Sequence, residues 1–242
     1  MSESPPPPAN PPADVLACEM RDRAREMFEC ALLECSIPRA FSKQVVYDRG
    51  DLRLGNDVYA LGSFSRTLIV SIGKAGHTMA EAFANTAGTG LMGIIACPNA
   101  PPAQLPGFRY FLGGHPLPNE ESLRAGDAIL RLLNAPSPQT LVVYLISGGA
   151  SAIAEKPISE GISLGDVVET YKALVYSGAP IAEINAIRKH LSALKGGRLR
   201  ARPRLPIRRR CWFPMCRREL SMRWPRVPQC QTPLRSPTVM PS

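Results

Sequence analysis

The sequence has no apolar stretch that approaches the roughly 18 residues a helix needs to cross a bilayer, which argues against a transmembrane protein. No basic segment followed by an apolar one opens the chain, so we do not expect a secretory signal. The seven cysteines form no Cys-X-X-Cys pair and no histidine clusters with them, which indicates neither a zinc site nor a disulfide framework. These absences predict a cytoplasmic protein with no metal-binding residues.

Nucleotide-binding signatures are also scarce. The Walker A pattern, in which a glycine-rich loop ends in Gly-Lys-Ser or Gly-Lys-Thr, is absent. Residues 88–93 match the dinucleotide fingerprint Gly-X-Gly-X-X-Gly, but a predicted helix precedes them and a predicted strand follows. Because the fingerprint requires a strand first and a helix second, we interpret residues 88–93 as a turn.

The last part of the chain lacks glycine, lysine, aspartate and asparagine. Residues 198–242 hold 12 arginines, 8 prolines and one acid, Glu219, so the formal net charge of +9 belongs to this tail and not to the mildly acidic body. With no apolar period, residues 200–242 are expected to be disordered. Two interpretations stay open: a coding region read in a shifted frame, or a genuine basic tail. Nucleic acid is not the partner we expect.

The beginning of the chain is rich in proline, and residues 1–13 are expected to form an extended leader. Asp14 is suited to cap an amphipathic helix, which Pro38 is expected to end. The apolar residues that recur at helical spacing in between are Ala24, Met27, Phe28, Ala31, Leu32 and Cys35.

Residues 141–146, Leu-Val-Val-Tyr-Leu-Ile, are apolar without alternation, which is typical of a strand buried on both faces of a parallel sheet. A loop of small residues follows, and a helix starting near Ser151 would aim free N–H groups into it. Such a loop suits phosphate or carboxylate, whereas a tight turn without a ligand is the alternative. The candidate ligand-binding residues of this loop are Ser147, Gly148, Gly149 and Ser151.

A second strand, residues 68–72, repeats this order: strand, glycine, functional side chain, helix. Gly73 and Lys74 follow it at once and residues 76–87 are helical in pattern, so Lys74 would face the crevice at the carboxyl end of a parallel strand. A solvated lysine at a helix start is the alternative. Further strands are predicted at residues 93–97 and 108–112, with a helix at 120–133 between them and the next strand.

Two helices are predicted after the glycine loop. The first runs from a capping box at Ser163 to about Tyr176, and the second covers residues 181–195. Asn185 and Arg188 lie three residues apart on one face of the second helix and could together hold a carboxylate or phosphate, although a solvated face is the simpler interpretation. His115 precedes a proline in a loop, where a structural role is more common than general-base chemistry.

Four segments, in this order, resemble the class II glycerate kinases, some of which are named as hydroxypyruvate reductases. They are IGKAGHTMAEAF (72–83), GGHPLPNEESLRAG (113–126), LISGGASA (145–152) and INAIRKHLSALKGGRL (184–199). The resemblance implies an α/β fold, a Rossmann-like αβα sandwich with a mostly parallel sheet, over residues 14–199. It also implies ATP-dependent phosphorylation of D-glycerate to 2-phosphoglycerate, with ATP and Mg²⁺.

Carried over by motif, Lys74 is implied to act at the transferred phosphate. Gly73, the glycine loop, Asn185, Arg188 and Lys195 are implied to bind substrate or phosphate. Ala150 departs from the family pattern, which has a third glycine there. The family's later aspartate, its second loop and its second domain have no counterpart, so we expect a chain that is weakly active or inactive. A nicotinamide-dependent hydroxypyruvate reductase and a non-catalytic fragment with a basic tail are the alternatives, and the oligomeric state is not indicated.

Overall fold

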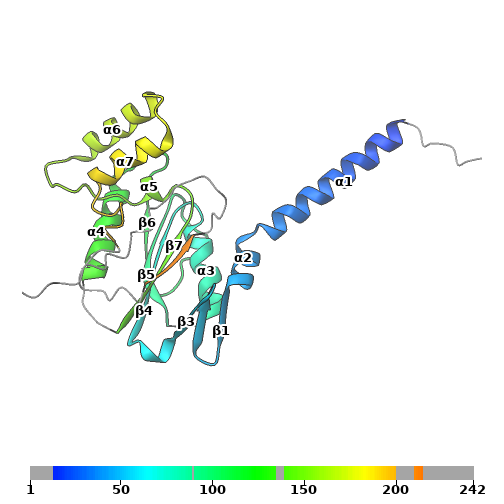
Figure 1. Ribbon diagram of the computed structural model, residues 1–242, viewed down its shortest axis with the longest axis horizontal. Coiled ribbons are helices and arrows are strands. Elements are labelled where there is room, and N and C mark those ends of the chain that lie inside the picture. Colours follow the sequence, from blue (N-terminus) through cyan, green and yellow to red (C-terminus); the bar gives the residue numbers. More distant parts are fainter. Residues whose placement is uncertain (1–12, 89, 135–138, 200–209, 215–242) are drawn as a thin grey trace, which may run out of the picture.

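The computed structural model describes residues 13–88, 90–134, 139–199 and 210–214 (Figure 1). Its centre is a five-stranded sheet in the order β6-β5-β4-β7-β8. Every neighbouring pair in this sheet is parallel. The strands are β4 (Arg66–Ile72), β5 (Met92–Cys97), β6 (Phe108–Leu112), β7 (Thr140–Ile146) and β8 (Arg210–Pro214).

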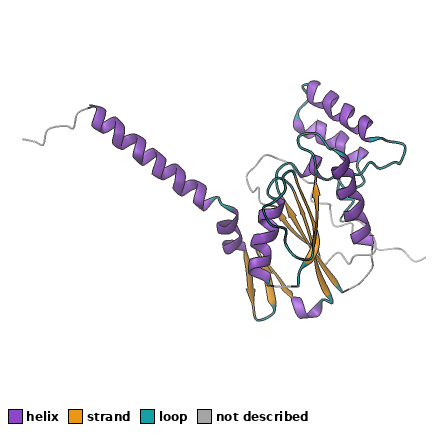
Figure 2. Ribbon diagram, turned by 180° about the vertical axis from the view of Figure 1, so that it is seen from behind, coloured by secondary structure: helices purple, strands orange, loops and turns teal. Residues whose placement is uncertain are grey.

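The central strands are buried on both faces, as their unbroken apolar runs predict. On one face, Val142 and Tyr144 of β7 join a core with α4 (Glu120–Asn134). On the other, Val143 and Leu145 join a core with α3 (Gly76–Ala87). Figure 2 shows helices on both sides of the sheet. The predicted α/β class and αβα sandwich are therefore confirmed.

A small antiparallel sheet, for which the sequence analysis had no prediction, lies beside α3. Its strands are β1 (Val45–Asp48), β2 (Asp51–Leu54) and β3 (Asp57–Ala60). Leu52 and Leu54 point into the core on the α3 face, where Phe41 of α2 (Ile37–Gln44) joins them. This sheet and α2 extend the second layer of the sandwich. Leu61–Ser63 forms a short 3₁₀ turn before β4.

Two helices cover the end of the molecule near the glycine loop. The capping box predicted at Ser163 is present, and α6 (Leu164–Tyr176) begins and ends as expected. The second helix, α7 (Ile181–Leu191), ends four residues before the predicted Lys195. Ser192 is extended there and forms an antiparallel bridge with Pro157, which takes the backbone out of the helix.

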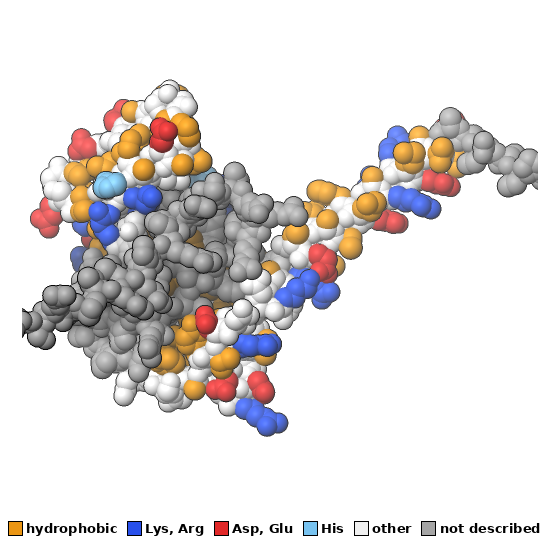
Figure 3. All heavy atoms as spheres, in the orientation of Figure 1, with side chains coloured by type: hydrophobic (Ala, Val, Ile, Leu, Met, Phe, Trp, Pro, Cys, Tyr) orange, Lys and Arg blue, Asp and Glu red, His pale blue; other side chains and the backbone are white. Residues whose placement is uncertain are grey.

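The first helix differs from its prediction in two ways. α1 (Ala13–Glu34) ends before Pro38, which lies in the first turn of α2, where proline costs no hydrogen bond. The side chains from Asp14 to Glu34 are all exposed, so the apolar face is not buried. In Figures 1 and 3 the helix projects away from the body with hydrophobic side chains along its length.

Part of the tail has regular structure. Five of its residues, Arg210–Pro214, form β8 and pair in parallel with β7, which corrects the expectation of disorder for those residues. Leader residues 1–12 and the remaining tail residues lie outside the described part of the chain, so these predictions are not tested. Among the described helices, none has the length and apolar content needed to cross a bilayer.

Candidate functional site

The lysine loop and the glycine loop lie side by side at the carboxyl edge of the sheet. β4 and β7 are hydrogen-bonded neighbours in parallel register, with Ile72 opposite Ile146, so the loops that follow them leave the sheet together. The amide of Lys74 donates to the Gly148 carbonyl at 2.8 Å, and the amide of Ser147 donates to the Ile72 carbonyl at 3.0 Å. The predicted placement of the two loops is confirmed.

Ser147 fastens the two loops together through its side chain. Its Oγ accepts the amide of Ala75 at 3.0 Å. Gly73, at φ 130°, lies so close that an added Cβ would come within 2.2 Å of the same oxygen. Only a residue without a side chain fits this contact and this backbone angle. Ser147, predicted as a ligand residue, therefore also has a positioning function, and Gly73 permits it.

The side chain of Lys74 is exposed and, within the described residues, has no ion-pair partner. Beside it, the amides of residues 148–151 donate no hydrogen bond to any described group. Consecutive free N–H groups of this kind form concave sites for anions. A mobile ammonium next to them is suited to phosphate.

The helix after the glycine loop is shorter than the sequence suggested. α5 (Ala150–Ile153) is a single turn of 4 residues, and Gly149 precedes it in the left-handed region at φ 84°. A single turn has little macrodipole, so the N–H groups themselves are the donors that the loop offers. Ser151 lies inside this turn, with its side chain half-buried.

His115, for which the sequence favoured a structural role over general-base chemistry, also lies at this edge. It lies in the loop after β6, and its imidazole is exposed. A Cβ on Gly149 would stand 2.7 Å from the His115 Cδ2, so the ring lies directly against the glycine loop. The signal that could have found it is the GGHPLPN segment, which already belonged to the family resemblance.

Lys195, by contrast, is enclosed in a buried network. Glu155, which is 2% exposed, accepts hydrogen bonds from the ammonium of Lys195, the hydroxyl of Tyr171 and, at 2.5 Å, the hydroxyl of Ser192. Lys195 also donates to the Tyr171 hydroxyl at 3.1 Å. Burial lowers the pKa of Lys195, and the Glu155 carboxylate opposes that change. Burial and the Glu155 charge together raise the pKa of Tyr171 above its ordinary value.

Asn185 and Arg188 share a face of α7, and both are half-buried. The guanidinium of Arg188 lies over the Tyr171 ring, 4.2 Å from its centroid. The candidate residues thus form two groups, one at the two loops and one around Tyr171. In the described part of the chain no hydrogen bond joins the groups directly. The chain links them, since Glu155 is the second residue after the end of α5.

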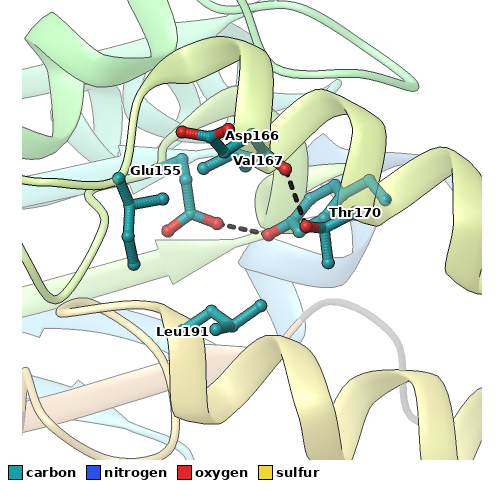
Figure 4. A pocket seen from close by; sticks show the side chains of 7 residues that line it. Glu155, Asp166, Val167, Thr170 and Leu191 are labelled. Atoms are coloured by element: carbon teal, nitrogen blue, oxygen red, sulfur yellow. Dashed lines mark hydrogen bonds between the residues drawn. The ribbon is translucent and has the colours of Figure 1, made fainter.

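A small cavity of about 190 Å³ lies between α6 and α7 (Figure 4). Ile162, Val167 and Leu191 give it an apolar wall. Glu155 and Tyr171 also line the cavity, and their polar groups are hydrogen-bonded to each other.

The described residues support neither a metal site nor a dinucleotide-binding loop. In the ranges that the structure describes, no three His, Cys, Asp or Glu residues gather in a way that could hold a metal ion. The Gly-X-Gly-X-X-Gly match at residues 88–93 lies between α3 and β5, at the amino end of the strand. The order is helix first and strand second, as predicted, whereas phosphates bind at the carboxyl ends of such strands.

Residues 23–204 match the family described as "Domain of unknown function (DUF4147)". The match covers most of the chain, and the chain belongs to this family. Among curated relatives, it is 34% identical over 142 residues to a D-glycerate 2-kinase of Thermotoga maritima, which covers 58% of this chain and 34% of the relative. It is 37% identical over 134 residues to a glycerate 2-kinase of Pyrococcus horikoshii, covering 55% and 30%.

Two solved structures are similar. A Pyrococcus horikoshii protein gives a TM-score of 0.66 at 30% identity, covering 74% of this chain and 40% of that one. The glycerate kinase of Thermotoga maritima gives 0.64 at 27% identity, covering 81% and 43%. The chain therefore spans about a third of the length of these curated relatives, with coverage of 34% and 30%.

Proposed function

We propose that this chain supplies the phosphate-binding part of a glycerate 2-kinase, which transfers the γ-phosphoryl group of ATP to D-glycerate. In this reaction the bond between the γ-phosphorus and the β-phosphate oxygen breaks, a bond to the C2 oxygen of glycerate forms, and the hydroxyl proton leaves. The products are ADP and 2-phosphoglycerate. The observation that carries the proposal is the exposed Lys74 beside the free amides of residues 148–151.

Phosphoryl transfer depends mainly on positioning and on neutralising charge. The free amides would bind phosphate oxygens, and Lys74 would neutralise charge on the transferred phosphoryl group. Ser147 and Gly73 would keep the two loops in register during the reaction. Asn185 and Arg188 are proposed to face the acceptor, whose carboxylate suits a guanidinium.

Mg²⁺ would enter this site with ATP, as part of the substrate. Since the described residues include no cluster able to hold a metal ion, we assign no residue of this chain to it and no step to it. The relatives' glycerate kinase names support ATP as donor and glycerate as acceptor. The alternative of a nicotinamide oxidoreductase gains no support, because residues 88–93 lie at the wrong end of the sheet.

The test is a comparison of Lys74→Ala with Lys172→Ala. Lys172 is also exposed, but it is paired with Glu169 on α6 and lies outside the proposed site. We expect Lys74→Ala to weaken ATP binding, measured by calorimetry, by about tenfold or more, the value of one charge-assisted contact. Lys172→Ala should bind ATP as the unmodified chain does.

Formation of 2-phosphoglycerate from ATP and D-glycerate is measured in parallel, on the same preparations. Any turnover should fall in the Lys74→Ala variant more than ATP binding does, because the lysine acts on the transferred group. Unchanged ATP affinity and turnover in Lys74→Ala would remove this lysine from the mechanism.

A further inference from the structure

Arg188 carries a positive charge that no described residue neutralises. Among the residues that the structure describes, no ion pair involves Arg188, and its Nε–H is buried without a hydrogen-bond partner. The Arg188 charge acts on the nearby ammonium of Lys195, and Lys195 already pairs with Glu155. The cluster is therefore left with one uncompensated positive charge and one unused donor.

A buried N–H without a partner is unfavourable, and such groups are rare in folded proteins. Arg188 nevertheless holds its position, because its guanidinium lies on the face of the Tyr171 ring, 4.2 Å from the centroid. This contact fixes the plane of the guanidinium while leaving its N–H groups free to donate hydrogen bonds. The arrangement is that of a guanidinium prepared for a planar or tetrahedral oxyanion.

The Tyr171 ring is itself fixed by a hydrogen bond from its hydroxyl group and by burial. Its hydroxyl donates to Glu155, and Tyr171 is 1% exposed. Glu155 is fixed in turn by Lys195, by Ser192 and by the amide of Lys156 at 2.9 Å. These partners come from the segment after α5, from α6 and from the turn after α7. Together they hold α7 against the chain that leaves the glycine loop.

We propose that Glu155 and Tyr171 are positioning residues that hold Arg188 as the anchor for an oxyanion of the substrate. Lys195 belongs to this supporting network and not to the groups that contact the ligand. The identity of the oxyanion, the carboxylate of glycerate or a phosphate, rests on the proposed function. The presence of the anchor does not, since it follows from the unpaired Arg188.

The test follows the Nε–H resonance of Arg188 by NMR in the 242-residue chain, assigned by its loss in Arg188→Lys. D-glycerate and inorganic phosphate are titrated separately, with sodium chloride at matched ionic strength as the control. We expect the resonance to shift with at least one of the two anions and not with chloride. A response to D-glycerate alone identifies a carboxylate site, and a response to phosphate alone identifies a phosphate site.

Three variants then separate positioning from folding. Tyr171→Phe keeps the ring and should bind the anion within about twofold of the unmodified chain, whereas Tyr171→Leu removes the ring and should bind about tenfold more weakly. Glu155→Gln keeps the shape and removes the charge that holds Tyr171 and Lys195. It should weaken binding as well, and it decides the question if Tyr171→Leu does not fold. Amide spectra show which variants are folded.

The proposal is overturned if neither anion moves the Arg188 resonance. It is equally overturned if folded Tyr171→Leu and Glu155→Gln bind the anion as the unmodified chain does. Lys74→Ala separates this inference from the proposed function. If Arg188 responds to D-glycerate while ATP binding is absent or insensitive to Lys74, the anchor stands and the kinase assignment fails.

Discussion

At the residue scale, the contact between Gly73 and Ser147 decides how closely the two loops approach. A Cβ at position 73 would meet the Ser147 Oγ at 2.2 Å and the Ser147 carbonyl oxygen at 2.8 Å. The second of these atoms is backbone and cannot turn aside. The close approach of the two loops therefore depends on position 73 having no side chain.

Gly73→Ala should accordingly destabilise the protein, by about 1–3 kcal/mol for a residue forced into a left-handed backbone conformation. Gly148→Ala is the matched control, because nothing lies within 4 Å of a Cβ built there. Urea denaturation of the two variants measures the difference. Equal stabilities would show that the loops can separate without loss.

The position of a residue could be predicted from the sequence only where it is determined by neighbours close in the chain. Lys74 and the glycine loop follow apolar strands directly, so their place at the sheet edge could be predicted from the sequence. Glu155 could not, since a lone glutamate followed by Lys156 has the pattern of a surface residue. Its burial results from partners 16, 37 and 40 residues later in the chain.

At the element scale, α6 is defined by its capping box. The Ser163 Oγ accepts the Asp166 amide at 3.2 Å, and the Asp166 carboxylate accepts the Ser163 amide at 2.9 Å. Two backbone donors are thereby satisfied at the helix start. This helix carries Tyr171, so its amino end sets the ring on which Arg188 rests.

Ser163→Ala should lower the free energy of unfolding by about 1 kcal/mol, the usual value of an N-cap. The hydrogen bonds from Ser163 hold the pKa of Asp166 below its ordinary value. A carboxyl group whose pKa is lower in the folded state stabilises fully above its unfolded pKa, and this contribution is lost as the pH falls through the folded pKa. In thermal melts the difference between Ser163→Ala and the unmodified chain should therefore shrink as the pH falls below the unfolded pKa of Asp166, whereas a difference independent of pH would contradict this.

Helices and strands were predicted correctly where a single hydrophobic pattern continues over the whole element. β4 to β7 and α4 are continuous apolar or amphipathic runs, and their predicted bounds agree closely with the structure, whereas β8 was not predicted. β1, β2 and β3 are 4 residues each, and even the strict alternation of β2 is too short to indicate a strand by pattern alone. α7 ended early because Ser192 pairs with Pro157, a contact that no local period contains.

At the scale of the whole molecule, α1 and the body are nearly independent. The only side-chain ties described between them are surface ion pairs from Glu34 to Arg39 and Lys43. Exposed pairs of this kind contribute little to stability. α2, in contrast, buries Phe41 in the core on the α3 face, where it is 1% exposed.

Removing residues 1–34 should therefore change the free energy of unfolding of the body by no more than about 0.5 kcal/mol, as for surface changes generally. Phe41→Ala should cost about 3–5 kcal/mol, because it empties a filled core position. Denaturation curves of the two proteins make the comparison. A large loss on removing α1 would show that its apolar face is covered by the rest of the chain in solution.

The parallel pairing of β4 with β7 also constrains how the chain can fold as it is made. The amide of Ala75 meets the Ser147 hydroxyl across 72 positions of sequence, so a nascent chain on the ribosome has β4 long before it has β7. Until then the edge of β4 that pairs with β7 has no neighbour and is exposed to chaperones and to aggregation. Pairing between such distant segments is also slow. The two loops can meet only after all of α4 and β7 has left the exit tunnel, so the order of synthesis determines when this edge of the sheet first forms.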